Sequence, residues 1–272
     1  MNIIQSILTI LDTRGAVPAA YGPYHMLCLA LTALLTVYAV FSGRHREEMK
    51  IRKVLLLTSL LVIGLEIYKQ INFTFGNGTG IPAFQWYAFP FQFCSTPMYV
   101  CLLAALMPKG RVHDALCAYL STYSVFAGVC VMLYPNDVFI NVVGINIQTM
   151  VCHGAMVVIG GYLLGSGHVK LEAKTVFKAM PVFACCVTIA AVFNELAHAA
   201  GIEGFNMFFI SPYETCTLPV YNLVHNVLPF PLNLAVYVLG FTAAAFIVMY
   251  VCRSIRFMWT RVHIHKAVPA VR

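Results

Sequence analysis

The sequence predicts an all-α polytopic membrane protein: one bundle of seven transmembrane helices, with the N-terminus outside and the C-terminus in the cytoplasm. Two observations indicate this class. The 272-residue chain is 60% hydrophobic and 10% charged, whereas about 25% of the residues in a soluble domain are charged. Its positive charges also lie in alternate gaps between the apolar segments, and short loops rich in Lys and Arg stay cytoplasmic.

Fifteen of the 17 Lys and Arg residues lie in four regions, namely 42–53, 108–114, 165–178 and the tail from 253. The intervening gaps 72–88, 135–141 and 198–230 carry none. A helix needs about 20 mostly apolar residues to cross the bilayer core. The segments that meet this requirement are 21–41, 53–72, 89–107, 115–134, 142–164, 176–198 and 231–252.

Two segments outside these spans are also apolar. Residues 1–14 lack a basic n-region and therefore do not resemble a signal peptide; they are expected to form an amphipathic helix on the outer leaflet. The outer loop 199–230 is long and rich in large apolar residues. Such a loop is expected either to fold over a pocket as a lid or to form a short interfacial helix that seals the bundle.

Composition argues against several functional classes. No basic run is interleaved with aromatic residues, so a nucleic-acid partner is not expected. No CxxC motif or Cys/His spacing suggests zinc, and we expect neither a metal nor a cofactor. The absence of an internal repeat does not favour an inverted-repeat transporter. We expect a multi-pass protein of the bacterial plasma membrane whose partners are membrane lipids.

Polar residues within the spans are candidates for function, because ionisable groups are costly in the membrane. In span two, Glu66, Lys69 and Gln70 share one helix face. They are expected either to form a self-satisfied ion pair or to hold a charged head group. In span six, Glu195 and His198 lie three residues apart; they form either an acid/base pair or two helix-end groups in water.

Span three contains the cysteine with the best case for reactivity. Pro90 suits a first helical turn, and Pro97 would kink the helix and free the carbonyl of Phe93 beside Cys94. The dipole near a helix N-terminus favours a thiolate. Cys94 is therefore a candidate nucleophile, with inert packing as the alternative.

Span five offers a candidate base for this nucleophile. Asn146 and His153 share a helix face, and Gln148 lies on another. His153 is either a general base or a satisfied core histidine. It would lie about 16 Å along its span and Cys94 about 8 Å along its own, so a direct contact requires a tilt or a kink. These polar groups all fall in the outer half of the bilayer, which predicts a pocket above a sealed inner half.

Short motifs in the chain resemble the YwaF-like bacterial integral membrane family, which is distantly similar to eukaryotic transmembrane protein 164. They are Pro90-x-Gln92-x-Cys94, His153-Gly154 and Asn206-Met207-Phe208. The eukaryotic relative looks like an acyltransferase that uses a membrane Cys on phospholipids. The resemblance implies Cys94 as the acyl-accepting nucleophile and His153 as its base. One position departs from the family pattern, because Gln92 stands where a His commonly precedes the Cys.

Two functions follow as expectations. The first is a lipid-directed acyltransferase in which Gln92, Asn146 or Gln148 supplies oxyanion donors. The second is a non-catalytic protein that binds or transports a small polar or lipid-like ligand from the outer face, with Glu66, Lys69 and Glu195 as charged contacts. A retinal protein is not expected, because span seven has no Lys for a Schiff base.

Overall fold

The computed structural model describes residues 11–42, 47–76, 81–135 and 138–267, with side chains described up to Trp259. Within these ranges the fold is all-helical, and the one β-type pairing is an isolated bridge between Arg14 and Val142. The helices are α2 (Pro23–Ser42), α3 (Glu48–Phe75), η1 (Trp86–Ala88), α4 (Thr96–Leu106), α5 (Arg111–Leu120), α6 (Tyr123–Leu133), α7 (Val143–Gly165), α8 (Ala173–Ala199), η2 (Met207–Phe209), α9 (Tyr221–His225) and α10 (Leu232–Ala267).

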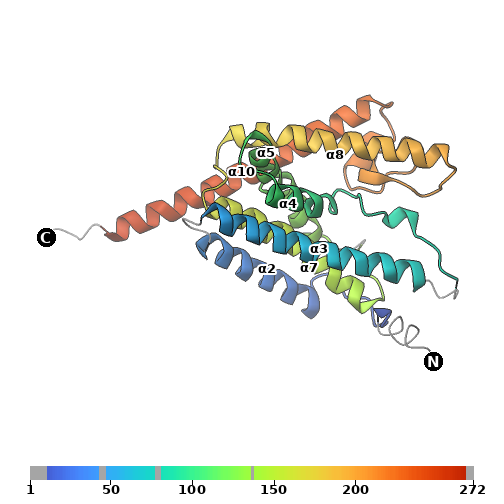
Figure 1. Cartoon of the computed structure of the whole chain (residues 1–272), viewed down its shortest axis with the longest axis horizontal. Helices are drawn as coiled ribbons and strands as arrows, with labels where there is room; N and C mark the ends of the chain where they lie inside the picture. Colours follow the sequence, from blue (N-terminus) through green and yellow to red (C-terminus); the bar gives the residue numbers. More distant parts are fainter. Residues whose placement is uncertain (1–10, 43–46, 77–80, 136–137, 268–272) are drawn as a thin grey trace.

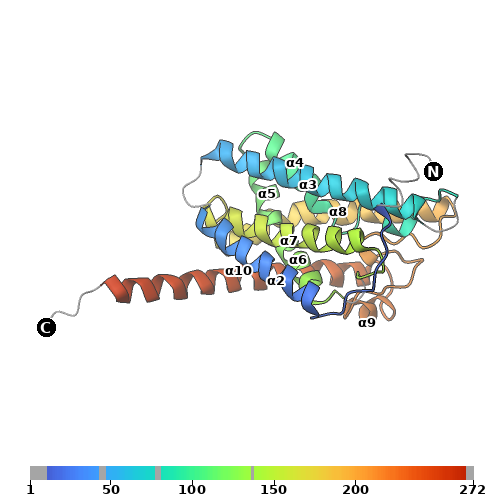
Figure 2. The same cartoon turned by 90° about the horizontal axis from the view of Figure 1, so that it is seen from below.

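The predicted membrane-helical class is confirmed. Six helical segments among the described residues are long and apolar enough to cross a membrane, and one of them consists of α5 and α6 together. The long helices run along a common direction, and α10 extends well beyond the rest of the bundle (Figures 1 and 2). Seven spans and the orientation of the termini stay predictions, as does the interfacial helix 1–14, most of which lies outside the described residues.

Helix α4 begins at Thr96, whereas a span from residue 89 was predicted. Residues 89–95 form turns, so Pro90 is not in a helical turn. Pro97 occupies the first turn of α4, where a backbone N–H has no intrahelical partner and the proline is tolerated. The expected kink is therefore wrong: the helix starts at this proline, leaving an 11-residue apolar helix.

The segment predicted as span four is also interrupted, between α5 and α6. The Ser121 hydroxyl donates to the carbonyl of Cys117 and the Thr122 hydroxyl to that of Ala118. Hydroxyls that bond back to a carbonyl four residues earlier compete with the helical ladder and bend helices. The break therefore coincides with two adjacent hydroxyl residues.

Helix α7 is central, since it contacts α2, α3, α5 and α6. Its glycines allow α2 to lie close against it. A Cβ added to Gly165 would lie 2.5 Å from the Val40 Cα, and one added to Gly161 would lie 2.8 Å from the Thr36 side chain. Small residues at a helix interface permit this approach in membranes, where packing drives association.

The loop from 199 to 230 is partly embedded in the core. Phe205, Met207, Phe208 and Ile210 are buried within the main hydrophobic cluster. Phe208 stacks on Phe93, with ring centroids 5.4 Å apart. Cys216, farther along the same loop, is also buried. The segment 205–210 is thus a packing element; whether another part of the loop acts as a lid stays a prediction.

Candidate functional site

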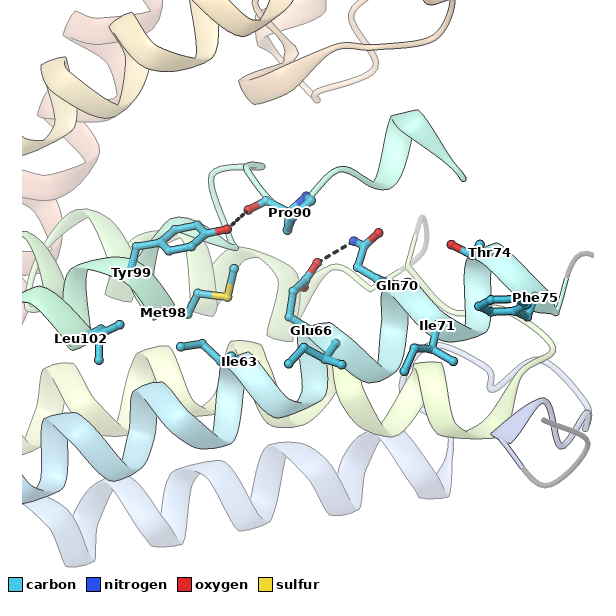
Figure 3. Close-up of a pocket in the computed structure, with 11 residues that line it drawn as sticks. Ile63, Glu66, Gln70, Ile71, Thr74, Phe75, Pro90, Met98, Tyr99 and Leu102 are labelled. Atoms are coloured by element: carbon cyan, nitrogen blue, oxygen red, sulfur yellow. Dashed lines mark hydrogen bonds between the residues drawn. The ribbon is translucent and has the colours of Figure 1, made fainter. Parts of the chain in front are cut away.

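A lateral groove of about 440 Å³ lies between α3 and α4 (Figure 3). Its wall is almost wholly apolar, with Glu66 and Gln70 near its middle. The lining comprises Ile63, Glu66, Ile67, Gln70, Ile71, Thr74, Phe75, Pro90, Met98, Tyr99 and Leu102. Its volume lies within the range of about 300–1,000 Å³ that ligand pockets occupy. The groove is therefore large enough to hold a hydrocarbon chain.

The predicted cluster on α3 forms as a buried ion-pair network beside this groove. Lys69 Nζ lies 2.8 Å from Glu66 Oε1, and the two side chains are 15% and 9% exposed. The Gln70 amide donates to the same carboxylate oxygen at 2.8 Å and to the carbonyl of Ala88 at 2.7 Å. The network thus links α3 to the irregular segment before α4. Tyr99 of α4 holds the same segment by donating to the carbonyl of Pro90 at 2.8 Å.

Cys94 lies two residues before α4 and is partly buried. It lines a small cavity together with Pro97, Met98 and Cys101. Met98 also lines the large groove, so the small cavity and the groove share this wall residue. Lys69 and Glu66 both act electrostatically on the Cys94 thiol. The charges of the Glu66–Lys69 pair therefore influence Cys94, although no charged group among the described residues hydrogen-bonds to its thiol.

His153 is buried on α7 with one ring nitrogen available. Its Nδ1 lies 2.7 Å from the carbonyl of Thr149. Its Nε2 is buried and has no hydrogen-bond partner. If Nδ1 carries the proton and donates it to Thr149, Nε2 is left as an acceptor, which is the state that a general base requires. Lys69 acts electrostatically on His153 as well as on Cys94, but no hydrogen bond joins His153 to the thiol.

Two of the three predicted oxyanion donors bond to backbone groups instead. Gln92 donates to the carbonyl of Asn206 and accepts from the N–H of Phe208, both at 3.0 Å. Asn146 bonds to both the N–H and the carbonyl of Ile140. Their amides hold backbone segments and are not free as oxyanion donors. Gln148, by contrast, makes weak contacts, with its amide 3.5 Å from the Cys152 sulfur.

The predicted pair on α8 is separate from the groove network in its contacts. Glu195 accepts a hydrogen bond from the Tyr213 hydroxyl at 2.8 Å. The His198 ring stacks on that tyrosine, with ring centroids 3.5 Å apart. The hydrogen bond to Glu195 raises the pKa of the Tyr213 phenol. Glu195 and His198 therefore both contact Tyr213 of the 199–230 loop, and no ion pair is seen between them.

Residues that the sequence did not single out complete the site and its frame. Met98 and Tyr99 line the groove, but an apolar or aromatic residue in a span carries no signal of its own. Asn194 donates to the carbonyl of Met207 at 3.0 Å and accepts from its N–H at 2.7 Å. A buried amide in a span was a usable signal, since such groups require partners.

Comparison with known proteins identifies one relationship. A model described as the TMEM164 family matches residues 20–253 of the chain. This range includes every described helix from α2 to α9 and most of α10. No curated protein and no solved structure matches the chain.

Proposed function

This chain belongs to the TMEM164 family, and from that premise we propose that it is a membrane-embedded, lipid-directed acyltransferase with Cys94 as nucleophile. One observation carries the proposal: Cys94 and Met98 line the same small cavity, and Met98 also lines an apolar lateral groove. A thiol beside a groove for a hydrocarbon chain is suited to accept an acyl group.

The surroundings of the groove favour a lipid as the substrate. Helix α3 is long and apolar enough to cross a bilayer, so exposed groove residues on it would contact lipid chains. Ile67 is 55% exposed and Phe75 is 46% exposed. An acyl chain could therefore enter sideways from the bilayer. The Glu66–Lys69 pair would lie beside the polar part of the lipid.

The chemistry that we propose has two steps. The Cys94 sulfur attacks the carbonyl carbon of a phospholipid ester, and its proton passes to Nε2 of His153, directly or through one water. The ester C–O bond then breaks, the leaving alkoxide takes that proton, and the acyl group remains as a thioester. A second hydroxyl acceptor then attacks the thioester carbonyl, the C–S bond breaks, and the proton of the acceptor passes to the sulfur and restores the thiol. Gln148 is the predicted amide with the weakest existing contacts and would stabilise the oxyanion.

A second candidate is a non-catalytic protein that binds a polar or lipid-like ligand in the same groove. The buried Glu66–Lys69 pair favours it, because a fixed charge pair beside an apolar groove suits a zwitterionic head group. In this function Cys94 would be a packing residue. The two functions therefore differ in their dependence on Cys94.

We further propose the topology in which the chain works: seven spans, with the third formed by residues 89–107 through a short helix, the N-terminus outside and the C-terminus inside. We assign the chain to the YwaF-like bacterial branch and to the plasma membrane. The Lys- and Arg-rich gaps support this orientation. Labelling of single cysteines introduced at Gly110 and Glu203 in intact cells tests it: a membrane-impermeant maleimide should react at 203 but not at 110.

A lipid-exchange assay tests the function. The full chain is reconstituted in vesicles that contain a phospholipid with a deuterated acyl chain and an unlabelled lysophospholipid. Mass spectrometry then measures the label on the acceptor. Cys94→Ser should abolish transfer. Cys101→Ser is the matched control, since Cys101 lines the same small cavity but is not the proposed nucleophile, and this variant should retain transfer. Equal transfer by Cys94→Ser and the wild type would contradict the acyltransferase.

A further inference from the structure

Four side chains with metal-ligating atoms meet at the end of the bundle where α3, α5 and α8 begin. Glu48 is the first residue of α3, and His113 and Cys117 lie one turn apart on α5. His168 comes from the turn between α7 and α8. One ligand atom each from His113, Cys117 and His168 lies within 4.8 Å of the others. This cluster is distinct from the groove site in every residue.

Three distances within the cluster are close to the edge length of a coordination tetrahedron. His113 Nε2 is 3.8 Å from Cys117 Sγ and 3.6 Å from Glu48 Oε1. The other carboxylate oxygen of Glu48 is 3.6 Å from His168 Nδ1. Ligands at about 2.0–2.3 Å from a tetrahedral zinc ion are about 3.3–3.6 Å from one another. Small movements would therefore place all four around one ion.

Two polar atoms of this cluster are buried without a hydrogen-bond partner. Glu48 Oε1 and His168 Nε2 are buried and have no hydrogen-bond partner. The side chain of His113 is fully buried. The Arg52 and Lys109 nitrogens approach the Glu48 carboxylate to 3.6 and 3.7 Å, beyond the usual N–H···O range. Buried polar groups normally have partners, so the unpartnered atoms indicate a missing ligand.

Local structure explains how the cluster assembles. His113 and Cys117 are four residues apart and share a face of α5. Gly167 has φ +76°, a left-handed conformation that ends α7 and directs the chain back. The imidazole ring of the next residue, His168, then lies perpendicular to that of His113, with ring centroids 5.1 Å apart. Because the ligands come from three separate segments, no short motif marks the site.

We propose that this cluster binds one Zn²⁺ through His113, Cys117, His168 and Glu48. Nitrogen and sulfur ligands in a tetrahedron select zinc among the common cations. The thiolate and the carboxylate together would neutralise its two positive charges. Asp114 Oδ1 lies 3.7 Å from His113 Nδ1, the place of an outer carboxylate that orients a metal-bound histidine. With four protein ligands the site would be closed and structural, and the ion would hold α3, α5 and the α7–α8 turn together.

Metal analysis of the full-length chain, purified in detergent from cells grown with zinc, tests this proposal. Elemental mass spectrometry should find about one zinc per chain. Replacement by Co²⁺ should give the thiolate-to-cobalt absorption band and strong tetrahedral visible bands. Cys117→Ser should lose the thiolate band, and His168→Gln should lose the metal. Cys130→Ser and His198→Gln serve as matched controls outside the cluster and should keep both.

Three results would overturn the site. They are a wild-type chain that neither contains zinc nor acquires it on titration, a cobalt thiolate band that persists in Cys117→Ser, and full zinc in His168→Gln. Should the ligand variants fail to fold, Asp114→Asn keeps every ligand. It should lower zinc affinity by about 10–100-fold in competition with a chelator. An unchanged affinity would contradict the coordination of zinc by His113.

Discussion

Replacing Gln92 with Leu should release the buried segment of the 199–230 loop. The Gln92 amide makes two hydrogen bonds to this segment, to the carbonyl of Asn206 and from the N–H of Phe208. Leucine has a comparable size but leaves both backbone groups without this partner. The variant therefore isolates the hydrogen bonds from the volume of the side chain.

The expected cost follows from the two groups left unpaired. Each buried group that loses its partner costs about 1–3 kcal/mol. Hydrogen bonds in membrane proteins average near the low end, so we take about 1 kcal/mol for each and about 2 kcal/mol in total. Since 1.4 kcal/mol is a factor of ten, local opening should become about 30-fold more frequent.

Hydrogen–deuterium exchange with mass spectrometry measures this opening directly. The peptide that spans 203–212 should exchange about 30-fold faster in Gln92→Leu, while peptides of α5 keep the wild-type rate. Gln85→Leu is the matched control, since the exposed Gln85 amide bonds to the carbonyl of Ala83. An unchanged rate for 203–212 in Gln92→Leu would refute the assignment of Gln92 as the anchor of this segment.

Three further changes test other parts of the structure. Lys69→Met should lower the free energy of unfolding by about 3 kcal/mol, because it leaves the Glu66 carboxylate buried without its cation. Adding Glu66→Leu to this variant should recover most of the lost free energy. Denaturant titration in detergent micelles measures both changes. Glu195→Gln should lower the pKa of Tyr213, measured by tyrosinate absorbance, because in the wild type the carboxylate accepts a hydrogen bond from the neutral phenol and stabilises it. This hydrogen bond therefore favours the folded state at pH values below the ordinary tyrosine pKa of about 10. The contribution is lost as the pH rises above the raised pKa of the folded state. Gly165→Ala should destabilise the bundle by about 1–3 kcal/mol, since the new Cβ would lie 2.5 Å from the α2 backbone.

Each of these changes has a comparison that could contradict it. A double variant at Glu66 and Lys69 that is no more stable than Lys69→Met would show that the pair is not a coupled unit. A Tyr213 titration that does not respond to Glu195→Gln, with Tyr213→Phe as the spectral reference, would remove the hydrogen bond as the cause. Gly64 has nothing within 4 Å of an added Cβ, so Gly64→Ala should not destabilise the protein; equal losses at Gly64 and Gly165 would refute close packing as the reason.

The helical membrane class could be predicted from the sequence because length and hydropathy act over about 20 residues at a time. The Glu66, Lys69 and Gln70 network was also predictable, because helical spacing alone places these residues on one face. Local turns were not predictable in the same way. The start of α4 at Thr96 depends on the hydrogen bonds of residues 89–95 with one another and with distant segments.

The hydrogen bonds of the candidate polar residues involve partners that the sequence alone does not identify. Gln92 was predicted as an oxyanion donor and Asn194 was given no role, yet both bond to backbone of the 206–208 segment. That segment pairs with them because Phe208 and Phe209 have positive φ angles of 61° and 59°, which turn the backbone in an uncommon way. Long-range contacts of this kind carry no periodic signal.

Intact-protein mass spectrometry, with and without hydroxylamine, tests the proposed acyl-enzyme most directly. After incubation with phospholipid vesicles, the wild-type chain should carry a fatty-acyl mass that hydroxylamine removes, because hydroxylamine cleaves thioesters. Peptide mapping should place it on Cys94, Cys94→Ser should lack it, and Cys101→Ser should retain it. A wild-type chain that stays unmodified, or an adduct that survives in Cys94→Ser, would contradict Cys94 as the acyl-accepting nucleophile.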